Sequence, residues 1–172
     1  KAMPIWEVVY EELIETQKID TLREPLMWSL LAGFLTGIYI WTWPPGVVLV
    51  GIVGVFTILK ISSDVVNEVT PEPTAFVVAV SMTLTSVMAL TRAQISAGFG
   101  TNDPTLLQPL AAISVAGAAV ALAALARLWE RNKIDSSLYP IAVAGLSGFG
   151  IIIVSALPIG IVDTVTDNLL RI

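Results

Sequence analysis

The chain has 172 residues, of which 55% are hydrophobic and only 13% are charged, and its mean hydropathy is +0.82. Soluble domains carry about 25% charged residues, so long uncharged stretches of this kind exclude an ordinary water-soluble fold. The sequence has no cysteine and no histidine, which removes disulfides, thiolate chemistry and the commonest general base and metal ligand. The net charge of −5 argues against a nucleic-acid partner.

The first predicted element is an amphipathic cytoplasmic or interfacial helix within residues 1–20. Apolar side chains recur there at helical spacing, and glutamates occupy most of the remaining surface. The apolar stripe predicts a docking surface for a partner or for the bilayer, formed by Trp6, Val9, Tyr10 and Leu13. The alternative is an ordinary helix packed on the protein's own loops. An acidic polar face argues against anionic headgroups, which attract Lys and Arg. No signal peptide is expected, because an acidic segment precedes the first apolar run.

Two long apolar runs follow, on either side of Pro44-Pro45-Gly46. The first predicts a membrane helix over about 22–43, with aromatic residues near both ends, as is typical of helices that meet two membrane interfaces. The second predicts a helix over about 46–63. Because about 20 apolar residues cross the hydrocarbon core, we expect a transmembrane hairpin; a re-entrant hairpin is the alternative.

The third predicted helix covers about 74–93 and carries several hydroxyl side chains. Ser81, Thr85 and Arg92 lie along one face of it and are candidates for lining a polar path. The alternative is that these hydroxyls bond to backbone carbonyls or to a neighbouring helix, as hydroxyls in membrane helices commonly do.

The fourth predicted helix, about 105–131, is rich in Ala, Gly and Ser, and the fifth, about 140–162, contains Pro158, where we expect a kink or an early end. Small residues four apart let membrane helices approach closely. The predicted helix-packing residues are Gly33, Gly37, Ser114, Gly117, Ala118, Ala121, Ala144 and Gly148. These patterns predict an all-α fold: a polytopic transmembrane bundle of about five helices, in which residues 21–172 form a single domain.

The distribution of Lys and Arg predicts the orientation. With five crossings and a cytoplasmic N-terminus, the outside segments hold only Arg92 and Arg171. The inside segments then hold Lys1, Lys18, Arg23, Lys60, Arg127, Arg131 and Lys133. The C-terminus is accordingly expected outside.

No catalytic group, cofactor site or metal site is predicted. Carboxylates fall only at predicted helix ends and in loops, and the membrane centres lack the ionisable residues that mark proton and ion pathways. Lys60, Asp64 and Glu68 share one helix face at four-residue spacing. This pattern is typical of a solvated ladder of charges; a cation or proton site is the alternative.

The sequence therefore predicts a non-catalytic integral membrane protein, a structural or accessory subunit of a membrane complex or an enveloped particle. Its predicted partners are the lipid bilayer and other membrane chains or copies of itself. The alternative is a small homo-oligomeric channel or carrier, and a membrane enzyme is the least expected class. In composition, the acidic loops, few lysines and abundant Ala, Val and Thr resemble proteins of salt-loving archaea.

Overall fold

The computed structural model describes residues 20–94 and 103–156, which form helices and their connections. The first four predicted membrane helices and the start of the fifth are present in this part of the chain. Their bounds, with two short 3-10 turns, are α2 (Asp20–Thr42), η2 (Pro44–Gly46), α3 (Val47–Val66), α4 (Glu72–Leu90), α5 (Leu107–Arg131), η4 (Ser136–Leu138) and α6 (Tyr139–Ala156). The predicted amphipathic helix, with Trp6, Val9, Tyr10 and Leu13, lies outside the described residues.

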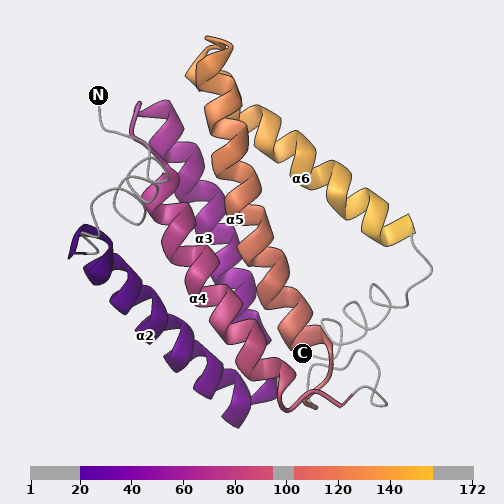
Figure 1. The fold of residues 1–172 in the computed structure, drawn as a ribbon. Coiled ribbons are helices and arrows are strands. Elements are labelled where there is room, and N and C mark those ends of the chain that lie inside the picture. Colours follow the sequence, from indigo (N-terminus) through magenta and orange to yellow (C-terminus); the bar gives the residue numbers. More distant parts are fainter. Residues whose placement is uncertain (1–19, 95–102, 157–172) are drawn as a thin grey trace.

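Successive helices run in alternating directions, and α4 lies at the centre of the packing (Figure 1). It packs most extensively against α5 and α2 and more lightly against α3, while α3 also packs along α5. Within the described part of the chain, four helical stretches are long and apolar enough to cross a membrane: Arg23–Thr42, Pro44–Val66, Glu72–Leu90 and Leu107–Arg131. The prediction of an all-α polytopic bundle is confirmed. The predicted fifth span, 140–162, begins as α6 but extends beyond the described residues.

Small and hydroxyl side chains make up much of the interior of the bundle, beside a few large ones such as Ile61 and Met82, and many large apolar side chains face outward. Ser29, Thr57 and Thr85 are almost fully buried, whereas Ile52 and Leu59 are 60% and 65% exposed. In water such an arrangement would be unfavourable. In lipid it is expected, because hydrocarbon solvates large apolar side chains and close helix packing depends on small ones.

Two helices end in the same way on one side of the bundle. Glu68 after α3 and Lys133 after α5 have positive φ, 57° and 54°. The next N–H groups, of Val69 and Ile134, donate back to the carbonyls of Asp64 (2.8 Å) and Trp129 (3.2 Å). This is the Schellman motif, which satisfies the last carbonyls of a helix and turns the chain sharply. Both turns occur here without the usual glycine.

Among the side chains of α6 that the structure describes, residues 139–147, burial is confined to the start of the helix. Tyr139 and Val143 are buried, but Leu146, one turn further along the same face, is 67% exposed. Figure 1 shows α6 diverging from α5 along its length. Within the described part of the molecule, α6 therefore depends on a few contacts at one end of the bundle.

Candidate functional site

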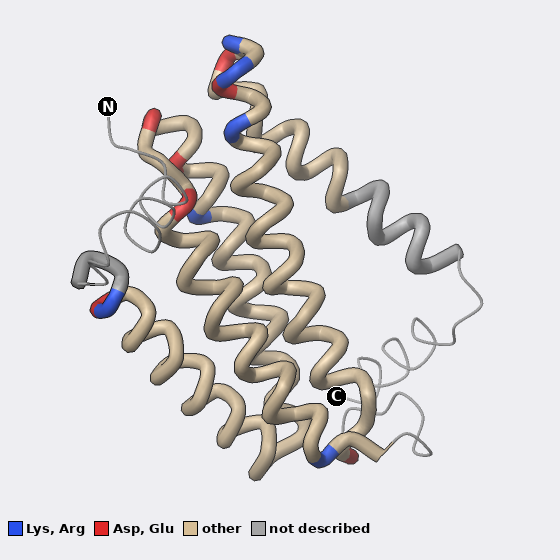
Figure 2. The backbone as a smooth tube through the Cα atoms, in the orientation of Figure 1, with Lys and Arg blue, Asp and Glu red and all other residues tan. Residues whose placement is uncertain are grey.

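Charge is distributed very unevenly along the bundle (Figure 2). We call the end with the α3–α4 and α5–α6 connections the charged end. It carries Arg23, Glu24, Lys60, Asp64, Glu68, Glu72, Arg127, Glu130, Arg131, Lys133 and Asp135. We call the opposite end, with Tyr39, Trp41, Trp43 and the Pro44–Gly46 turn, the aromatic end. Among the described residues it carries only Arg92 and Asp103 as charged groups.

At the charged end, Asp64 joins α3 to α4. Its buried carboxylate forms an ion pair with Lys60 one turn earlier, and the Thr74 hydroxyl of α4 donates to it at 3.4 Å. Glu68 does not extend this row, because its positive φ takes it out of the helix and into water. The predicted charge ladder is therefore a single ion pair within α3, and the Thr74 hydrogen bond to Asp64 links that pair to α4.

A second ion pair joins α4 to α5. Arg127 Nε lies 2.7 Å from Glu72 Oε1, and only 6% of the Glu72 side chain is exposed. The two residues are 55 positions apart, so sequence spacing gave no sign of the pair. The only signal was a carboxylate in the first turn of one apolar helix and an Arg near the end of another.

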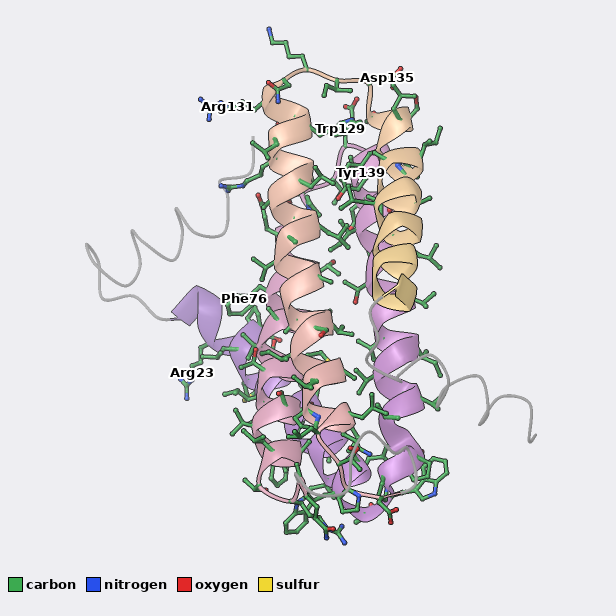
Figure 3. All side chains as sticks on the ribbon, turned by 90° about the vertical axis from the view of Figure 1, so that its right-hand side faces the viewer. Arg23, Phe76, Trp129, Arg131, Asp135 and Tyr139 are labelled. Atoms are coloured by element: carbon green, nitrogen blue, oxygen red, sulfur yellow. The ribbon has the colours of Figure 1, made fainter. Side chains whose placement is uncertain are left out.

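Aromatic contacts attach α6 to α5 at the same end, as Figure 3 shows. The Tyr139 hydroxyl donates to the Leu122 carbonyl at 2.8 Å, and the Trp129 and Tyr139 rings meet edge to face, with centroids 5.8 Å apart. Trp129 Nε1 also donates to the Asp135 carbonyl at 3.0 Å. The Ser137 N–H donates to the Asp135 carboxylate at 2.9 Å, and this bond lowers the pKa of Asp135.

At the aromatic end, Arg92 lies just beyond α4 and reaches across to α2. Its guanidinium donates to the Trp41 carbonyl and lies 5.8 Å from the centroid of the Trp41 ring. The Tyr39 and Trp43 rings form an edge-to-face pair at the same end, with centroids 5.6 Å apart. Such aromatic clusters are typical of the level of the lipid headgroups.

A small hollow lies next to Arg92, between the end of α2 and the turn that leads into α5. Its polar wall is the turn 103–108, which Gln108 holds in shape. The Gln108 side chain accepts from the Thr105 N–H at 2.9 Å and donates to the Asp103 carbonyl at 2.9 Å. Thr105 and Gln108 are 1% and 2% exposed, so this wall is rigid and its hydrogen bonds are made.

The two hydroxyls predicted for a polar path face a helix contact. Thr85 Oγ1 donates to the Gly33 carbonyl of α2 at 3.0 Å and to the Ser81 carbonyl at 2.9 Å. Ser81 Oγ donates to the Val78 carbonyl at 3.2 Å. Both side chains are buried between α2 and α4, whereas Arg92 lies at the aromatic end and is exposed. The three residues do not line a common path in the described structure.

Of the predicted packing residues, Gly33 and Gly37 lie at the α2–α4 contact. A Cβ added to Gly33 would lie 2.5 Å from the Ser81 carbonyl oxygen, and one added to Gly37 would lie 2.5 Å from Met88 Sδ. The α5 residues face outward: Ser114, Gly117, Ala118 and Ala121 are all exposed.

The stripe of α5 that packs inside the chain is a different one, formed by Ala112, Ala116, Ala119, Ala123 and Ala126. Because nearly every face of α5 carries small residues, their spacing did not identify the buried face. On α6, Ala144 is exposed, and the side chains from position 148 onward lie outside the described set.

No family model matches the chain. Over 168 residues it is 46% identical to a dolichyl-monophosphooligosaccharide–protein glycotransferase, AglB, of Haloferax volcanii. The match covers 98% of this chain but 15% of that protein. The structure is similar to that of the archaeal oligosaccharyltransferase AglB from Archaeoglobus fulgidus, solved with an inhibitory peptide and a dolichol-phosphate. There the TM-score is 0.70 at 21% identity, over 85% of this chain and 17% of that one.

These comparisons correct two predictions. The chain was expected to be a non-catalytic accessory subunit, or else a channel or carrier, and not an enzyme. Its relative, at 46% identity, is instead a glycotransferase, and nothing in the comparisons supports a separate complex subunit. The prediction rested on the lack of catalytic groups in this chain, which covers only 15% of the relative's length. The compositional resemblance to salt-loving archaea agrees with the source of the relative.

Proposed function

We propose that this chain forms part of the membrane domain of an enzyme that transfers an oligosaccharide from a dolichol-phosphate-type carrier to protein. The observation that carries the proposal is the 46% identity over 168 residues with the Haloferax volcanii glycotransferase. The chain spans only 15% of that protein's length, so the remaining machinery would lie in other parts of such an enzyme.

The described structure supports a role as a rigid membrane scaffold within that enzyme. Hydrogen bonds, the Glu72–Arg127 ion pair and close glycine contacts fix α2, α3, α4 and α5 against one another. The proposal treats residues 21–172 as one transmembrane domain. The outward small residues of α5 (Ser114, Gly117, Ala118 and Ala121) would then face other membrane helices of the same enzyme.

The charge distribution supports an orientation. The described Lys and Arg residues cluster at the charged end, with Arg92 alone at the other, and cytoplasmic loops are enriched in these residues. We infer that the charged end faces the cytoplasm and the aromatic end faces outside. With five crossings, this puts the N-terminus in the cytoplasm and the C-terminus outside.

The orientation can be tested directly because the chain has no native cysteine. We expect a membrane-impermeant maleimide added to intact cells to label Asp103→Cys and to leave Ser137→Cys unlabelled until the cells are opened. Labelling of Ser137→Cys in intact cells would refute the orientation.

The function can be tested by a segment exchange. The matching segment of the Haloferax volcanii enzyme is replaced by this chain, and membranes are assayed for transfer of lipid-linked oligosaccharide to an acceptor peptide. We expect the exchanged enzyme to retain transfer, and a second exchange carrying Gly33→Leu and Gly37→Leu to lose it, since both glycines lie at a close helix contact. A properly inserted exchanged enzyme without transfer activity would argue against the proposal.

A further inference from the structure

Arg92 is held differently from the two described basic residues that form ion pairs. At the charged end, Lys60 and Arg127 each pair with a buried carboxylate. Arg92 has no carboxylate within ion-pair distance among the described residues. Its guanidinium is held instead by the Trp41 carbonyl and the Trp41 ring.

Arg92 is therefore fixed in position without being neutralised. A carbonyl and an aromatic face orient the guanidinium but leave its full positive charge. Guanidinium has five N–H donors in a planar fork, and the described structure shows one of its nitrogens bonded, to Trp41. This planar set of N–H donors fits the oxygens of a phosphate group better than the donors of any other side chain do.

The surroundings of Arg92 suit a ligand that is part of the membrane. The hollow beside it is walled by the apolar side chains of Ile40, Pro44 and Ala89 and by the rigid turn that contains Thr105 and Gln108. Tyr39, Trp41 and Trp43 place the group at the level where headgroups meet the hydrocarbon. A charged headgroup could lie on Arg92 while the chain that carries it runs along the exposed apolar surface.

We propose that Arg92, seated on Trp41, binds the phosphate group of a membrane lipid at the aromatic end. Two lipids carry this chemistry: an acidic phospholipid of the bulk bilayer and a polyisoprenyl phosphate. The second source rests on the proposed function, whereas the first requires only that the chain spans a membrane.

The test measures lipid retention by native mass spectrometry. The full-length protein is reconstituted into zwitterionic phosphatidylcholine nanodiscs that contain either phosphatidylglycerol or undecaprenyl phosphate as the probe, and the bound probe is counted after release. Arg92→Gln removes the charge but keeps an amide donor for the Trp41 carbonyl. Arg131→Gln removes the same charge from an exposed position at the opposite end, and Arg92→Lys keeps the charge without the planar fork.

We expect Arg92→Gln to retain about fivefold less of at least one probe, since one basic residue near a membrane surface contributes roughly 1 kcal/mol to anionic lipid binding. Arg131→Gln should reduce retention clearly less, and Arg92→Lys should be intermediate. Loss confined to phosphatidylglycerol identifies a bulk-lipid site, and loss confined to undecaprenyl phosphate identifies a carrier site. Equal retention by Arg92→Gln and the unmodified protein, or an equal loss in Arg131→Gln, would overturn the proposal.

If Arg92→Gln does not fold, Trp41→Leu provides a second route. It removes the ring that orients the guanidinium but keeps the backbone carbonyl, and we expect it to weaken retention of the same probe. Lipid retention needs no transferase activity, so an inactive segment exchange with normal Arg92-dependent retention would count against the proposed function alone.

Discussion

The hydroxyl of Thr85 on α4 donates to the carbonyl oxygen of Gly33 on α2 at 3.0 Å. This bond is possible only because Gly33 has no side chain, which lets the two backbones approach. The same contact would bring a Cβ on Gly33 to within 2.5 Å of the Ser81 carbonyl oxygen. Gly33 therefore allows the two helix backbones to come close, and Thr85 forms the hydrogen bond that this short distance makes possible.

Replacing Gly33 by alanine should separate α2 from α4. The added methyl group meets backbone rather than a flexible side chain, and overpacking of this kind costs about 1–3 kcal/mol. Thermal unfolding of the purified protein in mild detergent measures the loss. Gly117→Ala is the matched control, because its added Cβ meets nothing within 4 Å; it should leave stability unchanged or raise it slightly, since Ala favours helix. Equal melting temperatures for the two variants would contradict the packing described here.

Thr85→Val removes the interhelical hydrogen bond while keeping the shape of the side chain. We expect a loss of about 0.5–1 kcal/mol, typical of single interhelical hydrogen bonds in membrane proteins. Thr83→Val, on an exposed face of the same helix, is the control and should have no effect. The measurement is the free energy of unfolding, obtained by steric trapping or by denaturant in detergent. A larger loss for Thr83→Val than for Thr85→Val would contradict the hydrogen bond between Thr85 and Gly33.

The Glu72–Arg127 pair should show strong coupling. Breaking a buried ion pair from one side costs roughly 3–5 kcal/mol, and we expect about 2 kcal/mol here because 34% of the Arg127 side chain remains exposed. Glu72→Gln combined with Arg127→Met should restore part of that loss, since neither charge is then left buried alone. A double-mutant cycle on the free energy of unfolding checks this. Simple additivity would show that the two side chains do not interact in the folded protein.

Tyr139→Phe should loosen α6 specifically. The variant keeps the buried ring but loses the hydroxyl that donates to the Leu122 carbonyl at 2.8 Å, a bond worth about 1 kcal/mol. Because α6 has few other contacts with the described bundle, we expect faster hydrogen exchange in residues 139–147 and no change in α4. Tyr39→Phe, at an exposed ring, is the control. Unchanged exchange in α6 would show that other contacts hold it.

The turn before α6 should respond to pH in one direction. The Ser137 N–H bonded to the Asp135 carboxylate lowers the pKa of Asp135 below its ordinary value of 3.8. The folded state thus favours the ionised form of Asp135. The resulting stabilisation of the folded turn is complete above pH 3.8, and it is lost as the pH falls through the lowered pKa of the folded state. Protection of the Ser137 amide against exchange should fall over that range. It should not depend on pH in Asp135→Asn.

The sequence alone determined that this chain lies in a membrane as a helical bundle, because long uncharged runs between loops allow few other solutions once backbone amides must pair within each segment. Proline and glycine marked the turn at 44–46, and the aromatic residues marked both ends of the first helix. The close approach at Gly33 and Gly37 could also be proposed from spacing, since few other residues in that helix are small.

Only the tertiary structure decided which face of α5 is buried, because alanines occupy all sides of it and no face stands out. It also decided that Glu72 pairs with Arg127 and that Arg92 rests on Trp41, since each pair joins residues more than 50 positions apart. The way the helices cross in three dimensions determines which of these residues meet. The spacing of residues along the sequence gives no information about that crossing.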